Sequence, residues 1–344
     1  METVRLALIG FGSVGQGLAQ ILYDKGDVYT WKFGLRFMIV AITDLVYGSA
    51  YNPEGLDLSS VLKIASEHRN LSLIPSYGNR WDALTMISQS NADVIVEISY
   101  TNFETGEPGL SHIRAAIENH KHVITTNKGP IALNYQELTN LARDKMVKLE
   151  VEGTVMSGTP VLRFGKKLLA GTEIRQIEGI LNGTTNFILT KMGDGVSYAD
   201  ALAEAQAQGY AEADPTGDVE GFDTAGKLVI LSSTILNTPI DIKQVERVGI
   251  TGLTLKDIEQ ARQDESTWKL VGRLEKHAGG VQAVVKPTCL PNSHPLANVE
   301  GATNAITFST DLLGDVTLIG PGAGRIETGY AIICDLLEIY AKDE

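Results

Sequence analysis

Cysteine is scarce in this sequence, with two residues among 344. Cys334 lies in an apolar helix pattern and is expected in the core, whereas Cys289 stands in the turn-like stretch TCLP. Neither cysteine has the spacing of a metal site. A chain of this length can bury a stable core without a disulfide bond. We therefore expect a reduced, cytoplasmic protein.

The sequence also has few basic residues and lacks long apolar segments. Lys and Arg number 29 against 42 Asp and Glu, which gives a net charge of −13. This balance argues against nucleic acid or an anionic membrane as a partner, because both require basic patches. No apolar run reaches the roughly 18 residues that a membrane helix needs. The first residues lack a basic flank before a long apolar region, so we expect no signal peptide.

The first part of the chain alternates short apolar runs with helical patterns. This alternation predicts a Rossmann-type parallel sheet with helices on both faces. We expect the strands at 4–10, 37–44, 90–99 and 122–128, and helices at 13–26 and 109–120.

The middle of the chain has a different pattern, with antiparallel-like strands among amphipathic and apolar helices. It predicts an α+β second domain with strands at 147–151, 173–181, 282–290 and 304–322 and helices at 198–210 and 225–236. The helix expected at 327–343 is apolar enough to return to the first domain. We therefore expect a dinucleotide-binding domain over 1–150, completed by about 310–344, and a substrate-binding domain over 151–310.

A glycine pattern, G-x-G-x-x-G, follows the first expected strand and opens the first helix. In this context the first glycine makes the turn, the second admits a pyrophosphate, and the third lets helix and strand pack closely. The phosphate then meets the N–H groups of the helix N-terminus. The alternative is a glycine-rich turn without a ligand. The residues of this loop are Gly10, Phe11, Gly12, Ser13, Val14 and Gly15.

Asp44 ends the second expected strand, where an acid can accept hydrogen bonds from the ribose hydroxyls of NAD. No arginine stands close behind it to receive the 2′-phosphate of NADP, so NAD is favoured and dual use stays open. Asp44 is alternatively a turn residue before 45–48.

Five acids precede a single lysine, Lys227, at the start of an apolar helix pattern. Asp223 and Lys227 are spaced i, i+4 and share one helix face. A lysine partly buried in a cleft can transfer a proton, and the nearby acids can hold water or bind the ammonium group of an amino acid. The alternatives are a helix salt bridge and a solvated acidic loop. The five acids are Glu212, Asp214, Asp218, Glu220 and Asp223.

Two further segments have both a functional and a structural interpretation. Lys128 follows an expected strand at the edge where ligands bind in open α/β sheets, or it is a surface lysine before a Gly-Pro turn. The segment 152–160 places one acid among small residues. Its carbonyl oxygens with one carboxylate suit a hard cation; otherwise it is a structural turn.

Six segments in order resemble homoserine dehydrogenase: GFGSVG, TTNKGP, EGTVMSGTP, GILNGTTNFIL, GYAEADPTGDVEGFDTAGKL and GPGAGR. The resemblance spans nearly the whole chain. It implies reversible NAD(P)-dependent interconversion of L-homoserine and L-aspartate 4-semialdehyde, in the pathway to threonine, methionine and isoleucine. It also implies a homodimer formed through the second domain. Some members of the family carry an aspartate kinase or a regulatory domain; we expect a stand-alone form without threonine inhibition through such a domain.

The resemblance also implies a role for individual residues. Lys227 transfers the proton, Lys128 orients the reacting oxygen and also contacts the cofactor, and Asp223 positions Lys227 and a water. The implied substrate residues are Gly183, Thr184, Gly209, Glu212, Asp218 and Asp223; further cofactor residues are Ser99 and Gly324; and a sodium site is implied at Glu152, Val155, Ser157 and Thr159.

Three alternative functions can be compared with the sequence. A dehydrogenase that acylates a cysteine needs a nucleophile in a polar, glycine-flanked setting, which neither cysteine has, and activity should survive replacement of both by serine. A non-catalytic nucleotide-binding regulator would bind NAD without oxidising homoserine. A scaffold protein has no need of the cleft-forming glycines.

Overall fold

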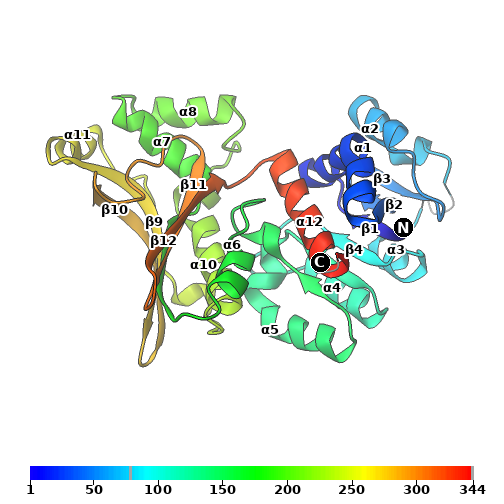
Figure 1. The fold of residues 1–344 in the computed structure, drawn as a ribbon. Helices are drawn as coiled ribbons and strands as arrows, with labels where there is room; N and C mark the ends of the chain where they lie inside the picture. Colours follow the sequence, from blue (N-terminus) through cyan, green and yellow to red (C-terminus); the bar gives the residue numbers. More distant parts are fainter. Residues whose placement is uncertain (77–79, 342–344) are drawn as a thin grey trace. The chain divides into compact units, whose positions relative to one another are not determined.

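The computed structural model describes residues 1–76 and 80–341, which divide into two compact units (Figure 1). The first unit holds residues 1–158 and the segment from Gly324 onward; the second runs from Thr159 to Ala323. The sequence prediction put these divisions at 150 and about 310. The assignment of cofactor and substrate to the two units stays a prediction.

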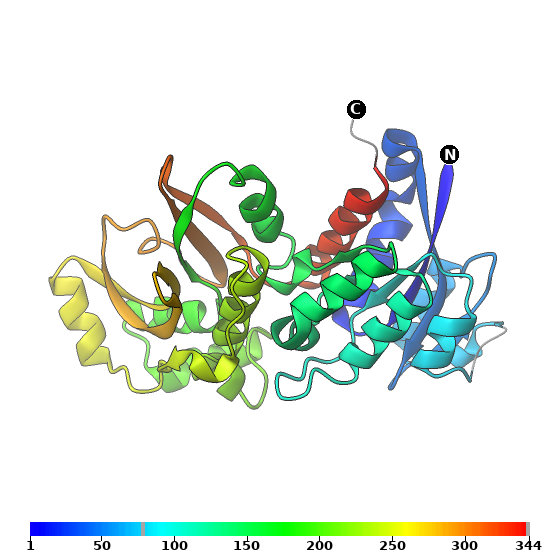
Figure 2. The ribbon, with the colours of Figure 1, turned by 90° about the horizontal axis from the view of Figure 1, so that it is seen from below.

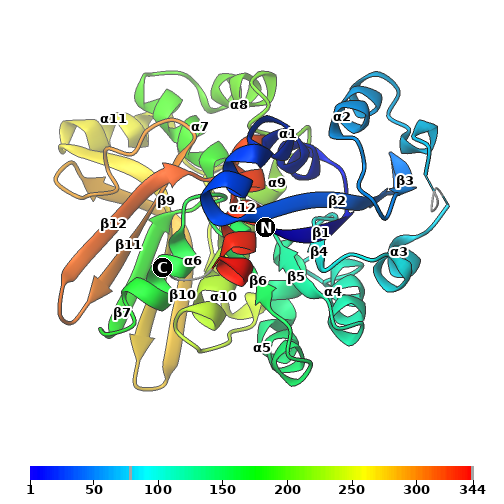
Figure 3. The same ribbon diagram turned by 45° about the vertical axis from the view of Figure 1, so that its right-hand side comes forward.

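The first unit is built on a six-stranded sheet in the order β3-β2-β1-β4-β5-β6 (Figure 3). Neighbouring strands are parallel except β3, which turns back antiparallel to β2. The sequence prediction did not include this strand; Gly48, with φ at +77°, allows the chain to reverse. The strands are β1 (Glu2–Ile9), β2 (Leu35–Asp44), β3 (Gly48–Tyr51), β4 (Val94–Glu97), β5 (His122–Thr125) and β6 (Leu149–Glu150).

Helices cover this sheet, and the C-terminal helix packs on the first one (Figure 2). A β-carbon at Gly17 would lie 1.9 Å from the Arg325 carbonyl oxygen, so the two helices meet backbone to backbone. The predicted return of this helix is confirmed. The helices are α1 (Ser13–Phe33), α2 (Leu58–Glu67), α3 (Ala83–Gln89), α4 (Gly109–Glu118), α5 (Lys128–Asp144) and α12 (Arg325–Tyr340), with short 3-10 turns at Leu71–Leu73 and Glu152–Thr154.

Helix α1 is longer than the sequence prediction. It continues past residue 26 to Phe33 and ends at Gly34, whose left-handed conformation lets its N–H bond to the Thr30 carbonyl. Residues 27–33, which the sequence prediction left outside the helix, are therefore helical. The core of the unit lies between the sheet and its helices and includes Leu6, Leu18 and Ile332.

The second unit is α+β, as predicted, with a six-stranded sheet in the order β12-β11-β7-β9-β10-β8. Its strand pairs are antiparallel except β8 with β10. Cys289 lies exposed within β10 rather than in a turn, so that detail of the sequence prediction is wrong. The strands are β7 (Ile174–Ile180), β8 (Glu246–Arg247), β9 (Ser266–His277), β10 (Gly280–Pro291), β11 (Thr303–Thr310) and β12 (Gly314–Pro321).

Two helices of this unit, α7 and α10, pack on the sheet and bring the acidic segment to it. Residues 224–234 of α10 are all buried, as its apolar pattern predicts. Gly272 in β9 permits the contact, because a β-carbon there would lie 2.8 Å from Thr224. The helices are α6 (Val161–Arg163), α7 (Gly183–Gly193), α8 (Tyr198–Ala207), α9 (Thr216–Val219), α10 (Phe222–Thr234) and α11 (Leu255–Gln263), with a π turn at Phe164–Leu168 and a 3-10 turn at Ile242–Gln244.

Within residues 1–76 and 80–341, none of the helices combines the length and apolar character that crossing a bilayer requires.

Lys269 in β9 is a buried cation, 1% exposed. Its ammonium group donates to Asn186 Oδ1 at 3.1 Å and to the Val299 carbonyl at 2.6 Å. Burial lowers its pKa from 10.5 to about 8, with Glu300 opposing the shift. The folded protein therefore loses this proton before the unfolded chain does, and the penalty for burying the charge is fully present below pH 8.

We accordingly expect Lys269 to make stability rise with pH between about 8 and 10. The wild-type free energy of unfolding should increase there by about 2 kcal/mol relative to Lys269→Met, which has no charge to titrate. Urea unfolding of both proteins across this range measures the difference. A difference that is constant from pH 8 to 10 would contradict the expectation.

Candidate active site

The glycine loop has the geometry that its pattern predicts for the first unit. Gly10 takes φ +107°, and a β-carbon there would lie 2.4 Å from the Ile98 carbonyl oxygen. A β-carbon at Gly15 would lie 3.0 Å from the Gly10 carbonyl oxygen. A β-carbon at Gly12 would meet no described atom within 4 Å, and this residue is the N-cap of α1. The loop therefore leaves the helix N-terminus open to an anion.

Asp44 holds both its own turn and the glycine loop. One carboxylate oxygen accepts from the N–H groups of Val46 at 2.7 Å and Tyr47 at 2.9 Å. The other accepts from the Phe11 N–H at 2.7 Å. The turn interpretation is thus correct, and the ribose contact stays a prediction that the remaining lone pair of Oδ2 permits.

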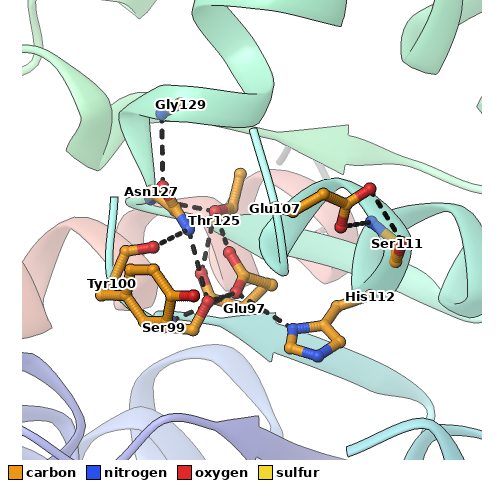
Figure 4. A network of polar contacts seen from close by, with 9 residues as sticks. All are labelled: Glu97, Ser99, Tyr100, Glu107, Ser111, His112, Thr125, Asn127 and Gly129. Atoms are coloured by element: carbon orange, nitrogen blue, oxygen red, sulfur yellow. Dashed lines mark hydrogen bonds and ion pairs between the residues drawn. The ribbon is translucent and has the colours of Figure 1, made fainter. Parts of the chain in front are cut away.

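Ser99 and Lys128 come shortly after the ends of two neighbouring parallel strands. Ser99 follows β4, and Lys128 follows β5. Lys128 is half-buried and is the first residue of α5, which Asn127 caps through its side-chain oxygen (Figure 4). The Asn127 amide nitrogen lies 3.4 Å from Ser99 Oγ. The carboxyl ends of parallel strands thus bring both predicted residues to one edge of the sheet.

Lys227 is buried in the second unit, with 6% of its surface exposed. Its Nζ donates to Asp223 Oδ2 at 2.6 Å and to the Leu181 carbonyl at 2.5 Å. Asp223 lies in the first turn of α10. The helix salt bridge considered from the sequence therefore exists, but it is buried rather than on a solvated face.

Asn182 links the carboxylates, and sequence reasoning missed it. Its amide nitrogen donates to Asp218 Oδ1 at 2.6 Å and to Asp223 Oδ2 at 3.0 Å. Its amide oxygen caps α7 by accepting from the Thr185 N–H at 2.9 Å. An asparagine just before a helical pattern is a capping signal, but that signal does not reveal the second contact.

Asp218 has a perturbed acidity. Burial raises its pKa above the usual range, and the charge of Asp223 adds to this, while the hydrogen bond from Asn182 opposes it. Removing a carboxylate from water destabilises its charged form. A cation placed beside Asp218 would relieve that penalty, so this group is suited to bind an ammonium ion.

The other predicted substrate residues lie at the start of α7 and in the segment after α8. Thr184 Oγ1 donates to the Tyr210 carbonyl at 2.6 Å. A β-carbon at Gly183 would lie 2.6 Å from the Ala302 carbonyl oxygen, so only glycine fits there. Gly209, with φ +76°, follows α8, and Glu212 is exposed in the loop beyond. Gly324, a predicted cofactor residue with φ +137°, is the N-cap of α12 in the first unit.

The predicted sodium segment forms a tight buried turn. Met156 and Ser157 both take left-handed backbone conformations, with φ of 55° and 54°. Glu152 is 5% exposed, and its N–H donates to the buried Asp335 carboxylate at 3.2 Å. Val155 is fully buried, whereas Thr159 begins the second unit. Among the described residues no three His, Cys, Asp or Glu side chains form a metal cluster, so an ion here requires carbonyl ligands.

Comparison with known proteins gives one consistent family. Residues 160–337 match the sequence profile described as homoserine dehydrogenase. An NAD(+)-dependent homoserine dehydrogenase of Pseudomonas canavaninivorans is 47% identical over 343 residues, covering 99% of this chain and 97% of the relative. A homoserine dehydrogenase of Methanocaldococcus jannaschii is 41% identical over 336 residues, covering 97% and 98%.

Solved structures agree with the sequence matches. A putative homoserine dehydrogenase from Archaeoglobus fulgidus has a TM-score of 0.88 at 35% identity, covering 98% of this chain and all of the other. A hyperthermophilic archaeal homoserine dehydrogenase mutant in complex with NADPH has a TM-score of 0.85 at 31% identity, covering 98% of both chains.

Proposed function

Because this chain belongs to the homoserine dehydrogenase family, we propose that its two units divide the work of that reaction. The enzyme interconverts L-homoserine and L-aspartate 4-semialdehyde with NAD or NADP. In the proposal the first unit binds the dinucleotide, and the second binds the amino acid and moves the proton. The regulator and cysteine-dependent alternatives are not favoured by the relatives.

The cofactor is held by the first unit. Its pyrophosphate lies at the N-terminus of α1, where the open space at Gly12 supports close approach of the backbone. Ser99, Lys128 and Gly324 complete the cofactor contacts. When bound, the nicotinamide accepts or supplies the hydride.

Proton transfer belongs to Lys227 in this proposal. During homoserine oxidation its amine takes the proton of the substrate hydroxyl, and during reduction its ammonium returns it to the aldehyde oxygen. Asp223 fixes the Nζ position through their 2.6 Å contact. Lys128 would orient the reacting oxygen for this transfer.

The substrate ammonium group binds among carboxylates. Asp218 and Glu212 receive it, with Gly183, Thr184 and Gly209 lining the pocket. The observation that carries the proposal is the partly buried chain of contacts from Lys227 through Asp223 and Asn182 to Asp218. It supports the proposal because it joins a proton carrier to a cation site. Steady-state assays of homoserine oxidation with Asp218→Asn test it; a raised KM for homoserine is expected, and an unchanged KM would remove Asp218 from the site.

We also propose that NAD is the preferred cofactor, because the Asp44 carboxylate repels a 2′-phosphate. Arg69 supports some use of NADP, since its guanidinium lies 5.5 Å from the centre of the Tyr47 ring, beside the Asp44 turn. No local pattern indicates this contact, because Arg69 is remote from Tyr47 along the chain.

Asp44→Asn is therefore expected to lower kcat/KM for NAD by about 10-fold and to lower it less for NADP. The amide keeps an oxygen for the turn but loses the charge. Arg69→Gln is the matched comparison and should affect NADP more than NAD. Equal losses with both cofactors in Asp44→Asn would mean that this residue does not contact the ribose.

Three finer features complete the proposal. A sodium ion binds the turn at 152–159 through carbonyl oxygens of Glu152, Val155, Ser157 and Thr159; the two buried carboxylates nearby support a cation. The protein is a homodimer formed through the second unit. It serves the aspartate-derived pathway to threonine, methionine and isoleucine. Activity in sodium against tetramethylammonium salts, and light scattering of the purified protein, test the first two.

A further inference from the structure

Glu97 is a fully buried carboxylate that the proposed mechanism does not use. It ends β4, at the sheet edge where Ser99 and Lys128 lie. Figure 4 shows its side chain turned toward the ends of the two neighbouring strands. Burying a carboxylate is costly unless its oxygens are hydrogen-bonded, so its partners indicate what it holds.

The two oxygens of Glu97 hold different segments. Oε1 accepts from the Ser99 N–H at 3.2 Å and from the Ser99 hydroxyl. Oε2 lies 3.2 Å from the Thr125 hydroxyl, which also donates to the Glu97 carbonyl at 2.8 Å. His112 Nδ1, from α4, lies 3.5 Å from Oε1. One side chain thus ties β4 to the end of β5.

From Thr125 the contacts continue to the start of α5. The Thr125 hydroxyl accepts from the Asn127 N–H at 3.0 Å. Asn127 in turn accepts from the Gly129 N–H at 3.2 Å and donates to the Tyr100 carbonyl at 3.1 Å. The residues on either side of Lys128, Asn127 and Gly129, are both hydrogen-bonded in this network. The position of the Lys128 backbone is therefore fixed.

The same turn also touches the glycine loop. A β-carbon at Gly10 would lie 2.4 Å from the Ile98 carbonyl oxygen and 3.0 Å from the Ser99 nitrogen. The peptide between Ile98 and Ser99 is therefore packed directly against the backbone of the loop. A shift of the Glu97 turn changes the place of Lys128 relative to the phosphate-binding backbone.

We propose that Glu97 is a positioning residue that sets Lys128 against the cofactor loop by holding the Ser99 turn and the N-terminus of α5 together. This inference rests on the proposed role of Lys128 in orienting the reacting oxygen. A charged carboxylate holds these segments more strongly than a neutral amide, because Oε1 accepts from the two Ser99 donors and Oε2 shares the Thr125 hydroxyl proton with the Glu97 carbonyl. In Glu97→Gln, the NH2 group must face either the two Ser99 donors or the Thr125 hydroxyl.

A double-mutant cycle tests the proposal. kcat for homoserine oxidation is measured for wild type, Glu97→Gln, Lys128→Ala and the double variant, with thermal unfolding of each. Glu97→Gln is expected to lower kcat about 10- to 100-fold in the wild-type background and less than about 3-fold in the Lys128→Ala background. A residue that only stabilises the fold would lower Tm and reduce activity by the same factor in both backgrounds.

The matched control is Glu107→Gln in the neighbouring loop. Glu107 accepts from the Ser111 N–H at 3.1 Å and hydroxyl at 2.9 Å; Glu107 is partly exposed and Ser111 is exposed. The kcat of the Glu107→Gln variant should equal that of the wild-type enzyme. If Glu97→Gln does not fold, Thr125→Val breaks the same link at the next atom and replaces it in the cycle.

The outcomes separate this inference from the proposed function. Wild-type kcat in Lys128→Ala would overturn both the role of Lys128 and the role of Glu97. An impaired Lys128→Ala with an unaffected Glu97→Gln, or with equal factors in both backgrounds, would overturn the positioning role alone. Loss in the wild-type background that disappears without Lys128 supports it.

Discussion

Lys227→Ala is expected to lower kcat for homoserine oxidation by about 100- to 10,000-fold while NAD binds with wild-type affinity. The substitution removes the proposed proton carrier from a buried position where Asp223 and the Leu181 carbonyl hold it. Cofactor affinity should be retained because the proposed phosphate site is in the first unit. Stopped-flow and steady-state assays with fluorescence titration of NADH measure both quantities.

Two comparisons sharpen this expectation. Lys227→Arg should not restore activity, because a guanidinium remains protonated and cannot take the hydroxyl proton. Lys191→Ala should be harmless, since Lys191 forms a partly exposed ion pair with Glu204 at 2.7 Å on α7 and α8. If Lys227→Ala kept wild-type kcat, the proton would be carried by another group.

The second large effect is expected from Asn182→Asp, with a loss in kcat/KM of about 100-fold or more. The new carboxylate can still cap α7, but it replaces the NH2 group that donates to Asp218 and Asp223. Three negative groups would then meet where two are bridged by a donor. Like charges at this distance repel strongly and raise the pKa of one another.

Asn182→Ala is the matched variant for this prediction. It loses both the cap and the bridge but adds no charge, so its kcat/KM should lie between those of wild type and Asn182→Asp. Steady-state kinetics of the three proteins with homoserine, alongside their thermal unfolding, give the order. An Asn182→Asp enzyme as active as wild type would show that the carboxylates need no bridge.

Local features of the site follow directly from the sequence. Gly10 and Gly15 are explained by their spacing after a strand, because a β-carbon at either position would meet backbone atoms that the turn brings close. The i, i+4 spacing of Asp223 and Lys227 likewise predicts their contact, since a helix places those positions on one face. The parallel strands of the first unit follow from their alternation with helices.

Contacts made across the fold could not be read from the chain. Asn182 and Asp218 meet because α7 and the segment before α10 come together, and no local pattern encodes that distance. Glu97 lies within the apolar strand predicted at 90–99, and no local pattern indicates the partners of its side chain. A charged residue in a buried strand is nevertheless an unusual feature. The sequence prediction missed β3 because this strand has only four residues and directly follows a turn.

The central claim is that Lys227 acts on the substrate hydroxyl beside the nicotinamide. A crystal structure of the enzyme with NADH and L-homoserine tests it most directly. The account predicts Lys227 Nζ within about 3.2 Å of the homoserine hydroxyl oxygen, with the substrate ammonium beside Asp218. A homoserine molecule bound with its hydroxyl beyond hydrogen-bonding reach of Lys227, in a complex whose nicotinamide faces the reacting carbon, would contradict it.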